Sequence, residues 1–307
     1  MDESRQPLVT VIAISYNHAP FIKEALTSVF NQSYKNIELI VVDDASTDNS
    51  AAVIDSCIAG KGIAFLKNKN NNGNCSSFNQ AYKQSSGKYI VDFALDDIMY
   101  CTRIEKQVAV LEAKSALVGV VFTNVQMIDI SGNNLYTQYP KFHHKQHAQQ
   151  IPEGWVFDAL LSQYYINPVG MLFRREVIGF LNGYDERLGY EDFDFWIRSS
   201  KQFEYVYLHE ILSAKRIVPT SLSTTFYKRN QAAMFQSTLT VCKKAWWLCK
   251  TEAEKKALVA RCRYEIRQAI KYNYIDVVKE YLVILQSVDG YSSLYTPFFK
   301  AWCWFKK

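Results

Sequence analysis

The first 95 residues alternate between two hydrophobic periods, and this alternation restricts the chain to few folds. Short β-branched and apolar runs predict strands at residues 8–15, 37–44, 63–67 and 88–95. The segments between them repeat apolar residues at helical spacing, as Ile22, Leu26 and Val29 do. Strands that alternate with helices form a mostly parallel sheet covered by helices, and ligands bind at the carboxyl ends of its strands. The sequence therefore predicts an α/β fold with a ligand-binding sheet edge.

Two pairs of adjacent aspartates stand at the ends of predicted strands. Asp43 and Asp44 end the second strand, and Asp96 and Asp97 follow the fourth. Adjacent carboxylates repel each other, and this repulsion is poorly screened at the end of a buried strand, so a nearby cation is expected. Capping of the helix that begins near Thr102 is the alternative role for the second pair. Because both pairs are expected at one sheet edge, a shared ligand site is favoured.

A third acidic group opens a predicted helix further along the chain. Glu191, Asp192 and Asp194 come first, and Phe195 and Trp196 would face inwards. The helix dipole stabilises carboxylates in a first turn, so a capping role remains open. In the functional interpretation, one ionised carboxylate projects into the cleft at the sheet edge, where it accepts a proton from a hydroxyl nucleophile.

The composition is that of an ordinary globular protein. The chain has 307 residues, 49% of them hydrophobic, which suits one large domain with an appendage or two smaller domains. Seven cysteines without a C-x-x-C pair argue against a disulfide framework and a zinc site, and favour a reducing cytoplasm. The polar N-terminus and the lack of a long apolar run predict neither a signal peptide nor a transmembrane helix.

Charge is distributed unevenly. From Ser221 onwards there are 15 Lys and Arg against 6 Asp and Glu, whereas residues 1–220 carry a net negative charge. The acidic part argues against a nucleic-acid partner, and the basic part suits an anionic membrane surface. The C-terminal end adds aromatic residues among lysines, namely Phe298, Phe299, Trp302, Trp304 and Phe305. These aromatics suit a peripheral membrane contact, or alternatively packing on the rest of the chain or on a second subunit of a homo-oligomer.

Three segments, taken in order, resemble the family 2 glycosyltransferases with the GT-A fold. They read VTVIAISYNHAPFIKEALTSVFNQSYKNIELIVVDDASTDNS, NNNGNCSSFNQAYKQSSGKYIVDFALDD and NGYDERLGYEDFDFWIRS. The resemblance spans residues 8–216 and rests on linked motifs. It implies a GT-A type, mostly parallel, Rossmann-like central sheet flanked by helices. The catalytic domain is expected at residues 1–225, and a basic, aromatic-rich helical C-terminal region at residues 226–307.

The resemblance implies a role for each residue that is expected to bind the nucleotide part of the donor. Tyr16 matches the aromatic residue that packs on the nucleotide base, and Asp44, with Asp43 beside it, matches the carboxylate that accepts the ring N–H of the base. Asp96 and Asp97 match the acidic signature that places Mg²⁺ or Mn²⁺ on the diphosphate of the donor.

On the acceptor side, Asp192 matches the general base of the family, and Glu191 stands beside it. The implied reaction is an inverting, metal-dependent transfer of a sugar from a nucleoside-diphosphate sugar, with a UDP- or dTDP-sugar favoured. The implied acceptor is a hydroxyl of a glycan or a lipid-linked molecule, in surface polysaccharide biosynthesis in the cytoplasm or at the inner face of the cell membrane. A catalytically silent nucleotide- or glycan-binding module of the same fold is the alternative. A nucleotidyltransferase is disfavoured because "SYNHAPFI" lacks a glycine-rich, basic phosphate loop.

Three positions depart from the pattern of the family. Ala94 stands at the first Asp of the common Asp-x-Asp-Asp metal motif, so the two later carboxylates must suffice. Phe78 stands where an Arg often precedes the Asn of the third helix, and Val218 replaces the His of a Tyr-Arg-x-His motif. The resemblance then implies either a weak metal site or a diphosphate held by Arg216 and by basic residues of the C-terminal region.

Overall fold

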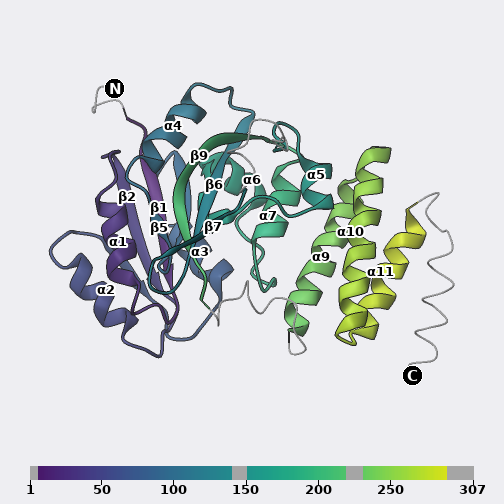
Figure 1. Ribbon diagram of the computed structural model, residues 1–307, viewed down its shortest axis with the longest axis horizontal. Coiled ribbons are helices and arrows are strands. Elements are labelled where there is room, and N and C mark those ends of the chain that lie inside the picture. The colour runs from purple at the N-terminus through teal and green to yellow at the C-terminus, as the bar shows by residue number, and fades with distance from the viewer. Residues whose placement is uncertain (1–5, 140–150, 219–230, 289–307) are drawn as a thin grey trace. The chain divides into compact units, whose positions relative to one another are not determined.

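The computed structural model describes residues 6–139, 151–218 and 231–288 (Figure 1). The chain divides into two compact units. The first unit comprises Met1–Trp155, Ile166–Glu186 and Gln202–Pro219, and the second comprises Val156–Tyr165, Arg187–Lys201 and Thr220–Lys307. Two short segments that precede residue 225 thus belong to the unit that also contains the C-terminal helices. The domain boundary predicted at residue 225 stays a prediction.

Within the described residues, the first unit is built on a nine-stranded sheet with the order β3-β2-β1-β4-β8-β6-β9-β5, and β7 pairs with β6. Its strands are β1 (Val9–Ser15), β2 (Ile37–Asp43), β3 (Ala64–Lys67), β4 (Tyr89–Ala94), β5 (Ile98–Met99), β6 (Val118–Ile128), β7 (Asn134–Thr137), β8 (Leu172–Arg174) and β9 (Glu204–Arg216). The neighbours from β3 to β4 are parallel, as are β6 and β9, whereas β5, β7 and β8 pair antiparallel. The predicted α/β fold with its mostly parallel sheet is confirmed.

The register of the parallel strands brings their carboxyl ends together. Ser15 of β1 pairs with Asp43 of β2, and Ile14 pairs with Ala94 of β4. The chain therefore leaves all three strands at the same edge of the sheet. This arrangement confirms that both aspartate pairs lie at one edge, as the alternation of strands and helices predicted.

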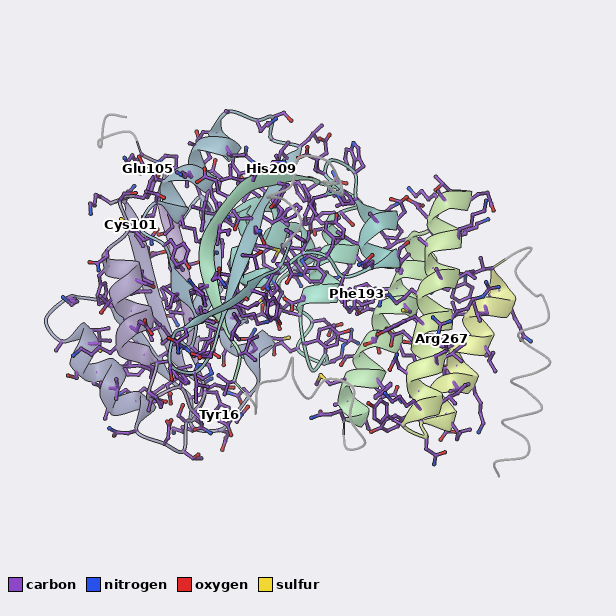
Figure 2. All side chains as sticks on the ribbon, viewed as in Figure 1. Tyr16, Cys101, Glu105, Phe193, His209 and Arg267 are labelled. Carbon is purple, nitrogen blue, oxygen red and sulfur yellow. The ribbon has the colours of Figure 1, made fainter. Side chains whose placement is uncertain are left out.

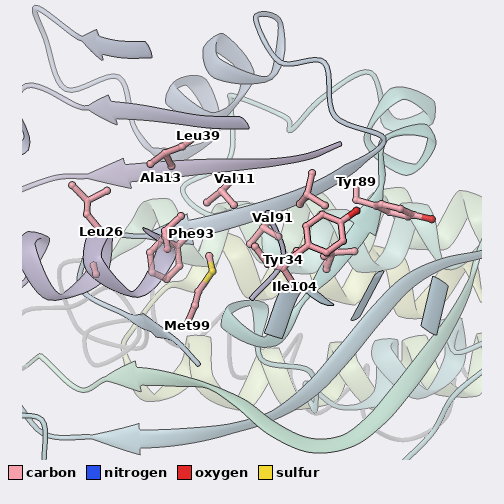
Figure 3. Close-up of a cluster of buried hydrophobic side chains, with 14 of the residues drawn as sticks. Val11, Ala13, Leu26, Tyr34, Leu39, Tyr89, Val91, Phe93, Met99 and Ile104 are labelled. Atoms are coloured by element: carbon pink, nitrogen blue, oxygen red, sulfur yellow. The ribbon is translucent and has the colours of Figure 1, made fainter. Parts of the chain in front are cut away.

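Helices of the first unit cover the sheet and complete its core. They are α1 (Ile22–Phe30), α2 (Ser50–Ile58), α3 (Asn74–Tyr82), α4 (Arg103–Glu112) and α6 (Arg175–Leu181). Alternate residues of a strand share one face, and Val11 and Ala13 of β1 pack in a buried cluster with Leu26 of α1 and Ile104 of α4 (Figure 3). This packing fixes the helices on the sheet, and with them the loops that follow the strands.

The apolar run VGMLF at residues 169–173 does not form one continuous strand. Residues Pro168–Gly170 form a 3₁₀ turn, and β8 starts at Leu172. Asn167 caps this turn by accepting a hydrogen bond from the Val169 amide, and Pro168 has no N–H to donate to a neighbouring strand. Local turn chemistry thus overrides the apolar run.

The second unit is helical in the described residues. It contains α5 (Phe157–Ser162), α7 (Asp192–Ser199), α9 (Ala232–Leu248), α10 (Glu252–Lys271) and α11 (Ile275–Ser287). Thr251 and Glu254 form a reciprocal capping box at the start of α10. One face of α10 packs in the core, since Leu258, Cys262 and Ile266 are fully buried. No described helix is both long enough and apolar enough to span a membrane.

Candidate active site

The loops that follow β1 and β2 are tied to each other at the sheet edge. The Asn17 amide donates to Ser46 Oγ at 2.9 Å, and Asn17 Oδ1 accepts from the Thr47 amide at 2.8 Å. The His18 amide donates to Ser50 Oγ at 3.0 Å. Asn17 and Ala45 adopt positive φ angles of 58° and 60°, which cost energy for residues other than glycine. These hydrogen bonds therefore hold residues 16–18 and 45–50, called the rim below, in a fixed and strained conformation.

Tyr16 is the first residue of this rim. Its side chain is 42% exposed, although it directly follows a fully buried strand (Figure 2). A large aromatic ring that remains accessible offers a flat apolar surface on which another ring can stack. The structure thus places the predicted base-stacking residue where a ligand can reach it.

Asp43 and Asp44 are both buried, and both accept hydrogen bonds from the protein. Asp43 accepts from the amide of Ser46 at 3.0 Å and from its hydroxyl at 2.6 Å. Asp44 Oδ1 accepts from Asn68 Nδ2 and the Asn72 amide, and Asp44 Oδ2 accepts from the Gly73 amide at 2.8 Å. Asp43 therefore fixes its own turn, and Asp44 anchors the loop that leads into α3.

Asp96 and Asp97 lie in the turn between β4 and β5. The N-cap of α4 is Thr102, and β5 lies between it and the acidic pair, so the capping alternative is wrong. Asp96 Oδ2 lies 3.8 Å from His18 Nε2, and the side chain of Asp96 is 14% exposed. Asp97 is buried, and its Oδ1 accepts from the Arg216 amide at 2.9 Å.

The acidic pair is not fully compensated by the surrounding protein. Burial raises the pKa of Asp97 well above its usual range, and the neighbouring charge of Asp96 raises it further. Lys215, the Arg216 amide and Arg103 oppose this rise without cancelling it. A cation at the pair would relieve the repulsion that burial intensifies. The arrangement therefore suits a positively charged ligand.

The residues present fit a divalent metal that is shared with a ligand. Among the residues that the structure describes, no three His, Cys, Asp or Glu side chains are close enough together to hold a metal alone. Mg²⁺ in enzymes is commonly bound by one or two carboxylates, with phosphate oxygens and waters completing its octahedron. Asp96 and Asp97 supply that number of carboxylates.

Arg216 has a structural role that the sequence did not indicate. Its side chain is buried, and Nε donates to the Asp96 carbonyl at 3.0 Å. Its other nitrogens donate to the carbonyls of Asp129 and Ile130 and to Glu24 Oε2, the last at 2.6 Å. Arg216 therefore ties the end of β9 to the acidic turn. Sequence reasoning missed Lys215, which no motif distinguishes from other lysines.

Phe78 and Asn79 explain one departure from the family pattern. Phe78 is fully buried and packs on Tyr184, with ring centroids 4.2 Å apart. Asn79 Nδ2 donates to the Tyr184 carbonyl and to Glu186, and Asn79 Oδ1 accepts from the Tyr184 amide at 2.9 Å. Position 78 thus belongs to the core, and Asn79 anchors the loop after α6.

The third acidic group lies in the second unit, at the start of α7. Glu191 is the N-cap residue and its side chain makes no capping hydrogen bond, while Asp192 is the first helical residue and is half-buried. Asp194 differs from both, because its side chain is 2% exposed and pairs with Arg198 and Lys244. The group thus divides into two partly exposed acids and one buried structural acid.

Comparison with known proteins agrees with this architecture. The chain is 30% identical over 220 residues to an uncharacterized glycosyltransferase of Rickettsia prowazekii, covering 71% of this chain and 67% of that one. It is 27% identical to a candidate glycosyltransferase of teichuronic acid biosynthesis from Bacillus subtilis, covering 75% and 87% of the two chains.

Two solved structures share the fold. Staphylococcus aureus TarS 1-349 in complex with UDP superposes with a TM-score of 0.70 and 16% identity, over 97% of this chain and 87% of that one. A mannosyltransferase from Pyrobaculum calidifontis in complex with GDP-Man and Mn²⁺ superposes with a TM-score of 0.59 and 18% identity, over 98% and 80%. Their likeness defines the architecture as that of the GT-A glycosyltransferases.

The sequence profile of glycosyl transferase family 2 matches residues 10–167, more than half of the chain. The chain therefore belongs to glycosyl transferase family 2.

Proposed function

We propose that this protein is an inverting glycosyltransferase that uses a UDP- or dTDP-sugar and acts in surface polysaccharide biosynthesis. The observation that carries the proposal is the shared sheet edge, where accessible Tyr16 and the acidic pair Asp96 and Asp97 follow parallel strands in register. Such an edge accommodates a base and a diphosphate together. The acceptor is a hydroxyl of a glycan or a lipid-linked molecule.

Recognition of the base rests on Tyr16 and Asp44. A carboxylate oxygen accepts up to two hydrogen bonds. Asp44 Oδ2 receives only the Gly73 amide among the hydrogen bonds described, so it retains capacity for the ring N–H of uracil or thymine. The loop that Asp44 anchors follows β3 and borders the same edge.

The diphosphate is proposed to share a Mg²⁺ or Mn²⁺ ion with Asp96 and Asp97. When bound, the ion neutralises negative charge that develops on the departing nucleoside diphosphate. Arg216 acts here through the protein, since its hydrogen bond to the Asp96 carbonyl and its amide contact with Asp97 hold the acidic turn in place.

Asp192 is proposed as the general base. The acceptor oxygen bonds to the anomeric carbon while the bond from that carbon to the diphosphate breaks, and the bonding electrons leave with the nucleoside diphosphate. The proton of the acceptor hydroxyl passes to the Asp192 carboxylate. A single displacement inverts the configuration at the anomeric carbon, and it needs no covalent intermediate on the enzyme.

Metal-dependent nucleotide binding tests the proposal. We expect UDP or dTDP with Mn²⁺ to raise the melting temperature, because a ligand that binds only the folded state adds about 2.7 kcal/mol at 100 times its Kd. Asp96→Ala should lose the metal-dependent part of this shift. Asp55→Ala is the matched control, because Asp55 forms a surface ion pair with Lys67 in the same unit. Failure of UDP, dTDP, GDP and CMP to shift the wild-type protein would favour the silent binding module.

We also propose a peripheral membrane contact through the C-terminal region. The aromatics predicted for this contact, from Phe298 to Phe305, lie outside the described residues. Within them, Trp247 is 79% exposed at the end of α9, beside Trp246 and close in sequence to Lys250. Exposed tryptophan with lysine suits an anionic membrane interface.

Flotation with vesicles measures that contact. The intact chain should float with vesicles that contain phosphatidylglycerol and much less with pure phosphatidylcholine, because lysines are attracted to anionic lipid. A chain that ends at Leu294 should float less. Equal flotation of the two chains would show that the C-terminal aromatics do not contribute to membrane binding.

A further inference from the structure

Helix α7 is held to helix α9 of the same unit by a partly buried ion pair. Lys244 Nζ of α9 lies 2.6 Å from Asp194 Oδ1 in the first turn of α7. The other oxygen of Asp194 accepts from Arg198 Nε at 2.8 Å, within α7 itself. The Asp194 side chain is 2% exposed and the Lys244 side chain 25%, so the pair is screened far less than a surface pair. Asp194 is two residues from Asp192.

The loop that enters α7 is fixed to the same face of α9. The Gly189 amide donates to Ser237 Oγ at 2.8 Å, and the hydroxyls of Tyr190 and Thr238 lie 2.8 Å apart. A Cβ atom at Gly189 would lie 2.2 Å from Met234 Cε, the flexible end of that side chain, so a larger residue at 189 would displace the Met234 methyl group. Gly189, Tyr190 and Asp194 therefore all contact helix α9.

Helix α10 holds the residue between Asp192 and Asp194. The Arg261 guanidinium lies 5.2 Å from the ring centroid of Phe193, which is fully buried. Arg261 also pairs with buried Glu265 at 3.2 Å and donates to the Leu161 carbonyl of α5. Both neighbours of the segment, α9 and α10, thus restrict the first turn of α7.

We infer that Lys244 is a positioning residue for Asp192, and that α9 thereby belongs to the catalytic apparatus of this chain. The inference rests on the proposed function, since it assigns to α9 the task of orienting the base. Asp192 is the first residue of α7, and its orientation is set by the turn that Lys244, Ser237 and Thr238 fix. Loss of the Lys244 contact should therefore impair the chemical step and spare binding of the nucleotide.

Lys244→Met tests this role with little risk to the fold. The variant keeps most of the side-chain stem, and Asp194 retains its ion pair with Arg198. Lys244→Arg restores the charge. Lys243→Met is the matched control, because Lys243 is the adjacent residue of α9 and pairs with Glu280 at the surface, with both side chains about half exposed.

Two measurements separate a positioning role from a merely structural one. In steady-state transfer assays, Lys244→Met should lower kcat by about 10- to 100-fold with KM for the donor unchanged, because misplacement by about 1 Å costs that much. Lys244→Arg should recover most of the activity, and Lys243→Met should match the wild type. In hydrogen exchange of the full chain, amides of residues 187–195 should exchange faster in Lys244→Met only.

The exchange measurement keeps the inference testable whatever the assay yields. If the wild-type protein transfers no sugar, the proposed function fails, and exchange alone decides whether Lys244 restrains α7. Unchanged exchange in Lys244→Met would overturn the inference. So would a wild-type kcat in that variant, or an equal loss of kcat in Lys243→Met.

Discussion

Asp192→Asn is expected to lower the rate of sugar transfer strongly while leaving nucleotide binding intact. An asparagine side chain is nearly isosteric with aspartate but cannot take up the proton of the acceptor hydroxyl. General bases contribute about 10²- to 10⁴-fold to rates, so kcat should fall by that factor. Isothermal titration with UDP and Mn²⁺ should give the wild-type Kd, because the proposed base-stacking and metal-binding residues belong to the first unit and Asp192 to the second.

Asp158→Asn is the matched control for this substitution. Asp158 also lies in the first turn of a helix of the second unit, α5, and is exposed. Both substitutions remove one carboxylate from a helix start, so a general effect of charge or helix stability would appear in both. Normal turnover by Asp192→Asn would contradict the assignment of Asp192 as the base. Equal losses in the two variants would show that the effect is not catalytic.

The sheet edge was predictable because it depends on backbone patterns. Short β-branched runs separated by segments with helical spacing admit few arrangements, and parallel strands end at one edge. The positions of Tyr16, Asp44 and Asp96 follow from chain direction alone. Local sequence alone therefore predicts that these three residues lie at the sheet edge.

The partners of these side chains were not predictable from local sequence. Arg216 was expected to hold the diphosphate, yet its guanidinium donates to carbonyls more than 80 residues away in the chain and to Glu24. Asp44 anchors residues 72 and 73, which a motif at residues 43 and 44 does not reveal. Such contacts depend on which elements pack together, and a one-dimensional pattern specifies this only weakly.

The acidic group at residues 191–194 also has one feature that the sequence predicts and one that only the fold determines. The sequence does not distinguish its three carboxylates from one another, and all of them could cap the helix. Burial separates them, because Asp194 meets Lys244 from 50 residues further along the chain whereas Asp192 stays partly exposed. A buried carboxylate needs a partner, and Asp194 has two in Arg198 and Lys244, so its role is structural.

Arg103→Met is expected to cause a large loss of stability. Arg103 is fully buried at the start of α4, donates to the Met171 carbonyl at 2.7 Å and to Gln107 Oε1 at 3.1 Å, and stabilises the charge of Asp97. Burial lowers its pKa to about 10, with Asp97 opposing this shift. Removal of the guanidinium leaves the buried Met171 carbonyl and Gln107 Oε1 without their donor, and each such loss costs about 1–3 kcal/mol. Urea unfolding at pH 7 should report a decrease in the free energy of unfolding of that size.

Lys106→Met separates this effect from a general response of α4. Lys106 lies one turn from Arg103 and pairs with Glu210, but both side chains are about 40% exposed. Exposed ion pairs contribute about 0–1 kcal/mol, so this variant should unfold close to the wild type. If Arg103→Met also unfolded like the wild type, the buried guanidinium and its hydrogen bonds would contribute nothing to the stability of the fold.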